Sequence, residues 1–149
     1  MFRSLAALNQ KAVGTPGHRF RDLYRLLNLQ ALYESFGSLK KNAAPGVDGM
    51  TWTAYEANLD ENLQGLLERL KAKRYRAPHV KRCYLPKGNG KLRPLGLPTL
   101  EDKIVQHAAS RILESMLEQR IDDGAFTGLI RKWLKAGVME PQGDCPEIL

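Results

Sequence analysis

Residues 80–106 read VKRCYLPKGNGKLRPLGLPTLEDKIVQ, and this stretch decides the fold class. Val80 to Leu85 have the composition of a strand, and Lys87-Gly88-Asn89-Gly90 carries the Asn-Gly pair typical of a tight hairpin turn. Lys91 to Leu97 would form the return strand. Pro94 must then lie at an edge or a bulge, because proline donates no hydrogen bond to a ladder. The stretch therefore predicts a small β-hairpin.

Helices are expected on both sides of this hairpin. Asn28 can cap one helix before it, and Thr53 with Glu56 makes the capping-box pattern of another. Thr99 can cap a long helix after the hairpin, with Asp102 in an acidic first turn. The apolar side chains that repeat at helical spacing are Phe20, Leu23, Tyr24 and Leu27; Leu29, Leu32, Phe36 and Leu39; Tyr55, Leu59, Leu63, Leu66 and Leu70; Ile104, Ala108, Ile112 and Met116; and Phe126, Leu129, Ile130 and Trp133.

Breaks between these helices are marked by turn-forming residues. Residues 42–50 contain a Pro-Gly and an Asp-Gly pair and are expected to form a loop, with Asp48 as a turn residue. The pattern stops again near Asp123-Gly124, and Gly137 is expected to end the last helix. Together these elements predict an α+β fold that is mostly α.

Composition narrows the class of partner. The chain has 149 residues, 43% of them hydrophobic, and a net charge of +7, which favours a polyanionic partner. Cys83 and Cys145 show no metal-type spacing and no disulfide framework, and a reduced cytoplasmic setting fits them. The three histidines are too scattered to predict a zinc site. No run of about 18 apolar residues predicts a membrane span, and the N-terminal residues are too polar for a signal peptide.

The strongest charge feature lies between Arg69 and Leu100, a segment without any acidic residue. Phosphate is the natural counter-anion for such a segment, and Tyr75 and Tyr84 could stack on a base or ribose. A solvated basic face is the alternative. The segment contains ten cations, which are Arg69, Lys71, Lys73, Arg74, Arg76, Lys81, Arg82, Lys87, Lys91 and Arg93. Of these, Lys71, Lys73, Arg74, Arg76, Lys81, Arg82 and Lys91 are the candidate nucleic-acid-binding residues.

Three segments resemble group II intron reverse transcriptases, also called maturases. They are PGVDGMT at 45–51, YLPK at 84–87, and KLRPLGLPTLEDKIVQ at 91–106. They follow the order and approximate spacing of the family's first conserved blocks, within a resemblance that covers roughly residues 18 to 142. The resemblance implies an incomplete fingers/palm unit of a right-hand polymerase. It also implies that Lys87 and Arg93 contact the triphosphate of an incoming nucleotide.

The sequence also departs from that family. Near Ser115 it passes directly to a segment that resembles family sequence downstream of the first palm aspartate, which suggests an internal deletion. We therefore expect a weakly patterned segment at 1–18, a fingers-like region at 19–116, a palm-derived helical fragment at 117–142 and an unpatterned tail at 143–149. Asp122 and Asp123 are expected to form a helix-end turn, so no catalytic or metal-binding residue is predicted.

The resemblance thus implies a truncated RNA-directed DNA polymerase that retains RNA- and nucleotide-phosphate-binding surface but lacks activity. Group II intron RNA, and also DNA, are the implied partners. No cofactor is expected in this chain, although the intact family uses Mg²⁺. Two alternatives stay open: a non-enzymatic RNA-binding module, and one part of a split reverse transcriptase that is active only with a palm fragment in trans.

Overall fold

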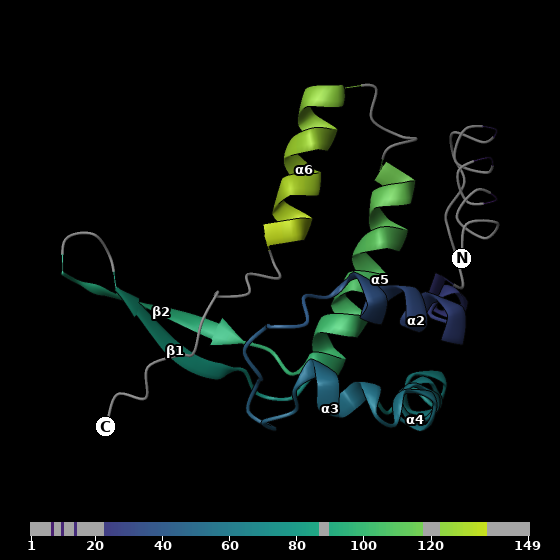
Figure 1. The fold of residues 1–149 in the computed structure, drawn as a ribbon. Helices are drawn as coiled ribbons and strands as arrows, with labels where there is room; N and C mark the ends of the chain where they lie inside the picture. The colour runs from purple at the N-terminus through teal and green to yellow at the C-terminus, as the bar shows by residue number, and fades with distance from the viewer. Residues whose placement is uncertain are drawn as a thin grey trace.

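The computed structural model describes residues 23–86, 90–117 and 123–136, with the isolated residues 7, 10 and 14. In that part the chain is mostly helical and carries one antiparallel β-hairpin, as predicted (Figure 1). The elements are η1 (Leu23–Leu26), α2 (Leu29–Ser38), α3 (Trp52–Glu56), α4 (Leu59–Lys71), β1 (Lys81–Pro86), β2 (Leu92–Leu97), α5 (Leu100–Leu117) and α6 (Gly124–Ala136).

The hydrophobic core lies where α2, α3 and α4 pack with the N-terminal half of α5. The predicted apolar stripes supply most of it, which confirms their periodicity. Phe36 of α2 stacks on Trp52 of α3 with ring centroids 4.6 Å apart. The buried core residues are Leu32, Phe36, Leu39, Trp52, Tyr55, Leu63, Leu66, Leu70, Leu100, Ile104 and Ala108. Phe20 of the first predicted stripe lies outside the described residues.

Two of the three predicted N-caps are confirmed. The side chain of Asn28 accepts a hydrogen bond from the Ala31 amide at 2.9 Å and begins α2. The hydroxyl of Thr99 accepts from the Asp102 amide at 3.3 Å at the start of α5. The predicted capping box of Thr53 with Glu56 is wrong, because Thr51 is the N-cap of α3 and accepts from the Ala54 amide.

The single helix expected over residues 53–70 is divided into α3 and α4. Asn58 separates them with non-helical backbone angles, φ −127° and ψ 42°. The side chain of Asn62 donates to the carbonyl of Tyr55 at 3.0 Å and bridges the break. Asparagine side chains often bond to nearby backbone in this way, which lets the chain leave the helix for one residue.

The hairpin projects to one side of the helices (Figure 1). Its strands pair with Lys81 opposite Leu97 and Pro86 opposite Leu92. Pro94 lies opposite Tyr84 in a sheet that has two strands in the described part of the chain, so it occupies an edge as predicted. The turn residues 87–89 lie outside the described residues, and Gly90 beside them has a positive φ of 75°, which glycine adopts without strain.

Two further observations complete the fold. Cys83 is buried and disulfide-bonded, so the expectation of reduced cysteines without a disulfide is wrong for this residue. Spacing along the sequence does not decide which cysteines the folded chain brings within bonding distance. The carboxylate of Asp123 accepts from the amides of Ala125 and Phe126, each at 3.0 Å, and so caps α6. Asp122 and the predicted cap Gly137 lie outside the described residues.

No helix in the described ranges is long and apolar enough to cross a membrane.

Candidate nucleic-acid interface

The acid-free segment between Arg69 and Leu100 runs from the end of α4, through an extended stretch, to both strands of the hairpin. Lys87 lies outside the described residues, so its predicted contact with a triphosphate stays a prediction. The other nine cations all have exposed side chains, and one of them, Arg69, forms an ion pair with a carboxylate of the helical core.

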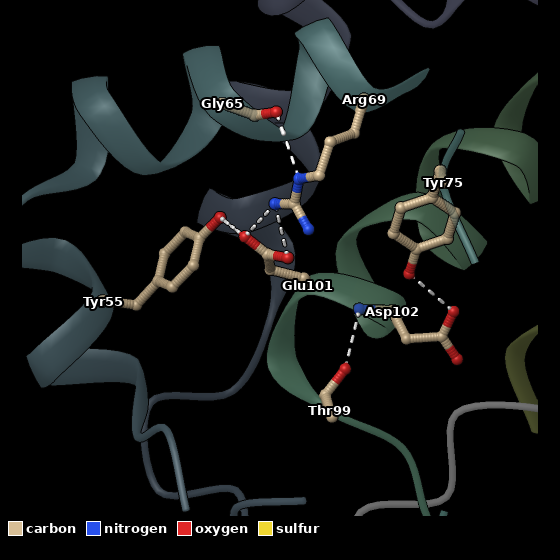
Figure 2. A network of polar contacts seen from close by, with 7 residues as sticks. All are labelled: Tyr55, Gly65, Arg69, Tyr75, Thr99, Glu101 and Asp102. Atoms are coloured by element: carbon tan, nitrogen blue, oxygen red, sulfur yellow. Dashed lines mark hydrogen bonds and ion pairs between the residues drawn. The ribbon is translucent and has the colours of Figure 1, made fainter. Parts of the chain in front are cut away.

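Arg69 is the cation that is neutralised within the fold. Its Nη2 lies 2.8 Å from both carboxylate oxygens of Glu101, and its Nε donates to the carbonyl of Gly65 (Figure 2). The hydroxyl of Tyr55 donates to the same carboxylate at 3.1 Å. Since Glu101 lies in the first turn of α5, this network connects α3, α4 and α5.

A second carboxylate in that turn holds the chain that follows α4. The hydroxyl of Tyr75 donates to one oxygen of Asp102 at 3.0 Å, and Gln106 donates to the other at 2.6 Å. Tyr75 is half-buried against the core, so the structure uses this tyrosine within the fold, although the sequence pattern suggested base stacking. Burial and the nearby carboxylates of Asp102 and Glu101 raise the pKa values of Tyr75 and Tyr55, so both hydroxyls remain donors at neutral pH.

The remaining cations of the segment all lie on the surface. Each has an exposed side chain, and no carboxylate lies next to any of them in sequence. They are Lys71, Lys73, Arg74, Arg76, Lys81, Arg82, Lys91 and Arg93. We call this set the exposed basic strip.

The hairpin register distributes the strip over two faces. Successive side chains of a strand point to opposite faces, and directly paired residues share a face. Arg93, opposite Leu85, is therefore on the face that buries Cys83 and Leu97. Arg82 is on the other face. Arg82 and Arg93 consequently begin from opposite faces of the hairpin.

The face that carries Arg82 is exposed throughout. It contains Tyr84, which is 39% exposed, and Leu92, which is 51% exposed, with Pro94 directly opposite Tyr84. An exposed tyrosine beside an arginine is suited to stack on a base while the guanidinium meets phosphate. The predicted stacking role is therefore compatible with the position of Tyr84.

The loop at 42–50 packs directly against the start of α5. A Cβ on Gly46 would lie 2.7 Å from Thr99 Cα and 2.8 Å from the Pro98 carbonyl oxygen, so only glycine fits. Asp48 Oδ1 accepts from the Met50 amide at 3.1 Å, which confirms it as a turn residue. The contact of Gly46 with Pro98 and Thr99 joins the first and third of the motifs that carry the family resemblance.

Lys103 strengthens the same junction and was missed by the sequence patterns. Its side chain is 2% exposed, and its Nζ donates to the carbonyl of Ala44 at 3.1 Å. The available signal was its position in the first turn of α5, where the helix dipole disfavours a cation. A lysine kept there must have another partner, and in this fold the loop carbonyl supplies one.

The aspartates in the described ranges make contacts within the fold. No group of three His, Cys, Asp or Glu side chains there could hold a metal ion. Asp48 and Asp123 bond to backbone amides, and Asp60 accepts from the hydroxyl of Tyr33. Together with Asp102, each described aspartate therefore has a partner close by.

Comparison with known proteins shows which sequences the chain is similar to. No family model matches the chain. The chain is similar to curated group II intron-encoded proteins, and this similarity supports the resemblance that its motifs indicated.

Similar proteins are found in Lactococcus lactis and in Escherichia coli. The group II intron-encoded protein LtrA of Lactococcus lactis subsp. cremoris is 34% identical over 106 residues, 70% of this chain and 18% of that protein, and its counterpart in strain MG1363 matches equally. Protein YkfC of Escherichia coli K12 is 44% identical over 81 residues, 54% of this chain and 21% of that protein. The chain thus spans about a fifth of the length of these relatives.

Proposed function

We propose that this chain is a fingers-like unit of the group II intron reverse transcriptase (maturase) type, and that it binds RNA through the exposed basic strip. The observation that carries the proposal is the exposure of eight cations on a segment without carboxylates. Arg69 provides the contrast: it belongs to the same segment but forms an ion pair with Glu101, as a cation with a structural role does. Intron RNA is the RNA class that the similarity to LtrA favours.

Binding dominated by phosphate contacts has a measurable signature. Affinity falls as salt rises, with a log-log slope of about −0.7 per neutralised phosphate on a single strand. The test is a titration of fluorescent single-stranded and structured RNA between about 50 and 200 mM KCl, with DNA of the same sequence as competitor. We expect weak binding with a steep slope and little sequence preference. Absence of binding at low salt, or insensitivity to salt, would overturn the proposal.

We further propose that Lys87 and Arg93 hold the phosphates of a nucleotide. The side chain of Arg93 is exposed, and a guanidinium can bind two phosphate oxygens at once. Arg93→Lys should therefore weaken dNTP binding by roughly tenfold or more, as expected for loss of a charged hydrogen bond. Lys81→Arg, which keeps a cation on the same face of the hairpin, is the matched control. Equal dNTP affinities of the wild type, Arg93→Lys and Lys81→Arg would show that Arg93 has no specific role in binding the nucleotide.

As regards chemistry, we propose that this chain alone does not extend a primer. The local hydrogen bonds of Asp48 and Asp123 support this proposal, since both carboxylates serve their own turns. The test supplies poly(rA), oligo(dT), Mg²⁺ and dTTP. Extension above the blank that disappears in Asp122→Asn/Asp123→Asn would contradict it.

One observation favours the second candidate, a split enzyme completed by a palm fragment. Apolar side chains on α5 and α6 are exposed, notably Leu113, Phe126 and Leu129 at 41% to 47%. Exposed apolar surface of this kind is typical of an interface. Primer extension that appears only when a palm fragment is added would establish this candidate over a non-enzymatic RNA-binding module.

A further inference from the structure

At the end of α4, Lys73 adopts a left-handed backbone conformation that residues other than glycine rarely adopt. The amide of Lys73 donates to the Leu70 carbonyl at 2.9 Å, and the amide of Arg74 donates to the Arg69 carbonyl at 3.0 Å. These two bonds form a Schellman motif, whose residue after the C-cap adopts the left-handed conformation and is usually glycine. Here that residue is Lys73, with φ 54°, and it is the one non-glycine residue with positive φ in the described ranges.

Capping of the helix does not explain the lysine. The Ala72, Lys73 and Arg74 amides already satisfy carbonyls of the last turn, so a cationic side chain is not needed for that purpose. Arg69 and Lys71 already place positive charge in the last turn of α4. Glycine at position 73 would give the same hydrogen bonds without strain. A strained residue that persists at such a position points to a role for its side chain.

The neighbouring side chains indicate what that role is. Lys71, Lys73, Arg74 and Arg76 are all exposed and lie within six consecutive positions. A turn that presents several cations to solvent, with no carboxylate in the segment, has the charge that a phosphate backbone complements. The segment is also continuous in sequence with β1, which carries the next cations of the strip.

We infer that the Schellman turn at the end of α4 is a discrete contact site for RNA backbone phosphate, with Lys73 held in a strained conformation to make that contact. This inference rests on the proposed RNA-binding function and adds a particular site to it. It predicts that replacing Lys73 with glycine raises stability, because the backbone strain is relieved, and weakens RNA binding, because the phosphate contact is lost.

Three substitutions separate charge from strain. Lys73→Arg keeps both and should leave RNA binding and melting temperature unchanged. Lys73→Gln keeps the strain but removes the charge, so the magnitude of the log-log salt slope should fall by about 0.7 with little change in melting temperature. Lys73→Gly removes both, so the slope should fall equally while the melting temperature rises by about 2–4 °C. Lys132→Gln removes an exposed lysine from α6 and is the matched charge control.

The outcomes distinguish this site from the broader function. If the wild type shows no salt-dependent RNA binding, the proposed function fails and the site fails with it. If the wild type binds but Lys73→Gln has the wild-type slope, or the slope of Lys132→Gln, the site is wrong and the function stands. A melting temperature of Lys73→Gly at or below that of the wild type would overturn the strain argument. Equal or tighter binding to anionic phospholipid vesicles, weakened by Lys73→Gln, would overturn the assignment to RNA.

Discussion

In the helical core charged side chains have partners within the fold, whereas in the exposed basic strip they face solvent. Arg69 and Arg74 are five residues apart in the same acid-free segment and both are exposed, yet only Arg69 of the two forms an ion pair with a carboxylate among the described residues. Lys103 likewise turns inward to the Ala44 carbonyl, while Lys81 is exposed on β1. The difference shows that a run of basic residues contains both cations that are paired within the fold and cations that face solvent. Which of the two a residue becomes depends on partners that are distant in sequence.

The most severe test of the core is at Gly46. A methyl group there would meet backbone atoms of Pro98 and Thr99, which cannot move aside as a side chain can. Gly46→Ala should therefore lower the free energy of unfolding by about 3 kcal/mol, the upper end of overpacking costs. Urea denaturation measures it.

Gly37→Ala is the matched control, because a Cβ on this residue of α2 would meet nothing within 4 Å. It should raise stability by roughly 0.5–1 kcal/mol through helix propensity. If Gly46→Ala is as stable as Gly37→Ala, the motif loop and α5 are not in the close contact described.

The next test concerns the ion pair that distinguishes Arg69 from the strip. Glu101→Gln should lower the free energy of unfolding by about 1–2 kcal/mol, since charged hydrogen bonds from Arg69 and Tyr55 weaken. Because Arg69 is about half exposed, its coupling to Glu101 in a double-mutant cycle should be smaller, about 0.5–1 kcal/mol. The same cycle with Arg74→Gln should give zero coupling, and equal coupling in both cycles would remove the distinction.

A smaller effect, of opposite sign, is expected within the core. The hydroxyl of Ser35 is buried and has no hydrogen-bond partner among the described residues. Ser35→Ala should therefore raise the free energy of unfolding by about 0.5–1 kcal/mol. In Ser38→Ala the lost hydroxyl is exposed and donates to the Glu34 carbonyl, so no gain is expected. Thermal melts of the two variants decide, and a destabilised Ser35→Ala would reveal a partner for the hydroxyl.

Local patterns predicted the elements that local physics controls. The Asn89-Gly90 pair and the flanking strand residues predicted the hairpin, and apolar periodicity predicted the buried faces of α2, α4 and α5. The break at Asn58 was missed because a continuous apolar stripe crosses it.

The candidate site was less predictable, for a physical reason. The cations of the strip could be named from sequence, but the pairing of Arg69 with Glu101 joins residues 32 positions apart. The division of Arg82 and Arg93 between two faces required the strand register. Contacts of this kind depend on tertiary packing, which a charge pattern does not contain.

The most direct test compares one substitution in each region, Arg69→Gln and Arg82→Gln, because both remove one guanidinium from the same segment. Stability is measured by urea denaturation and RNA affinity as a function of salt. Arg82→Gln is expected to reduce the magnitude of the salt slope by about 0.7 and to change stability by less than about 0.5 kcal/mol. Arg69→Gln should instead lose about 1 kcal/mol of stability with an unchanged slope. An equal loss of slope in both variants would contradict the division into structural and RNA-binding cations.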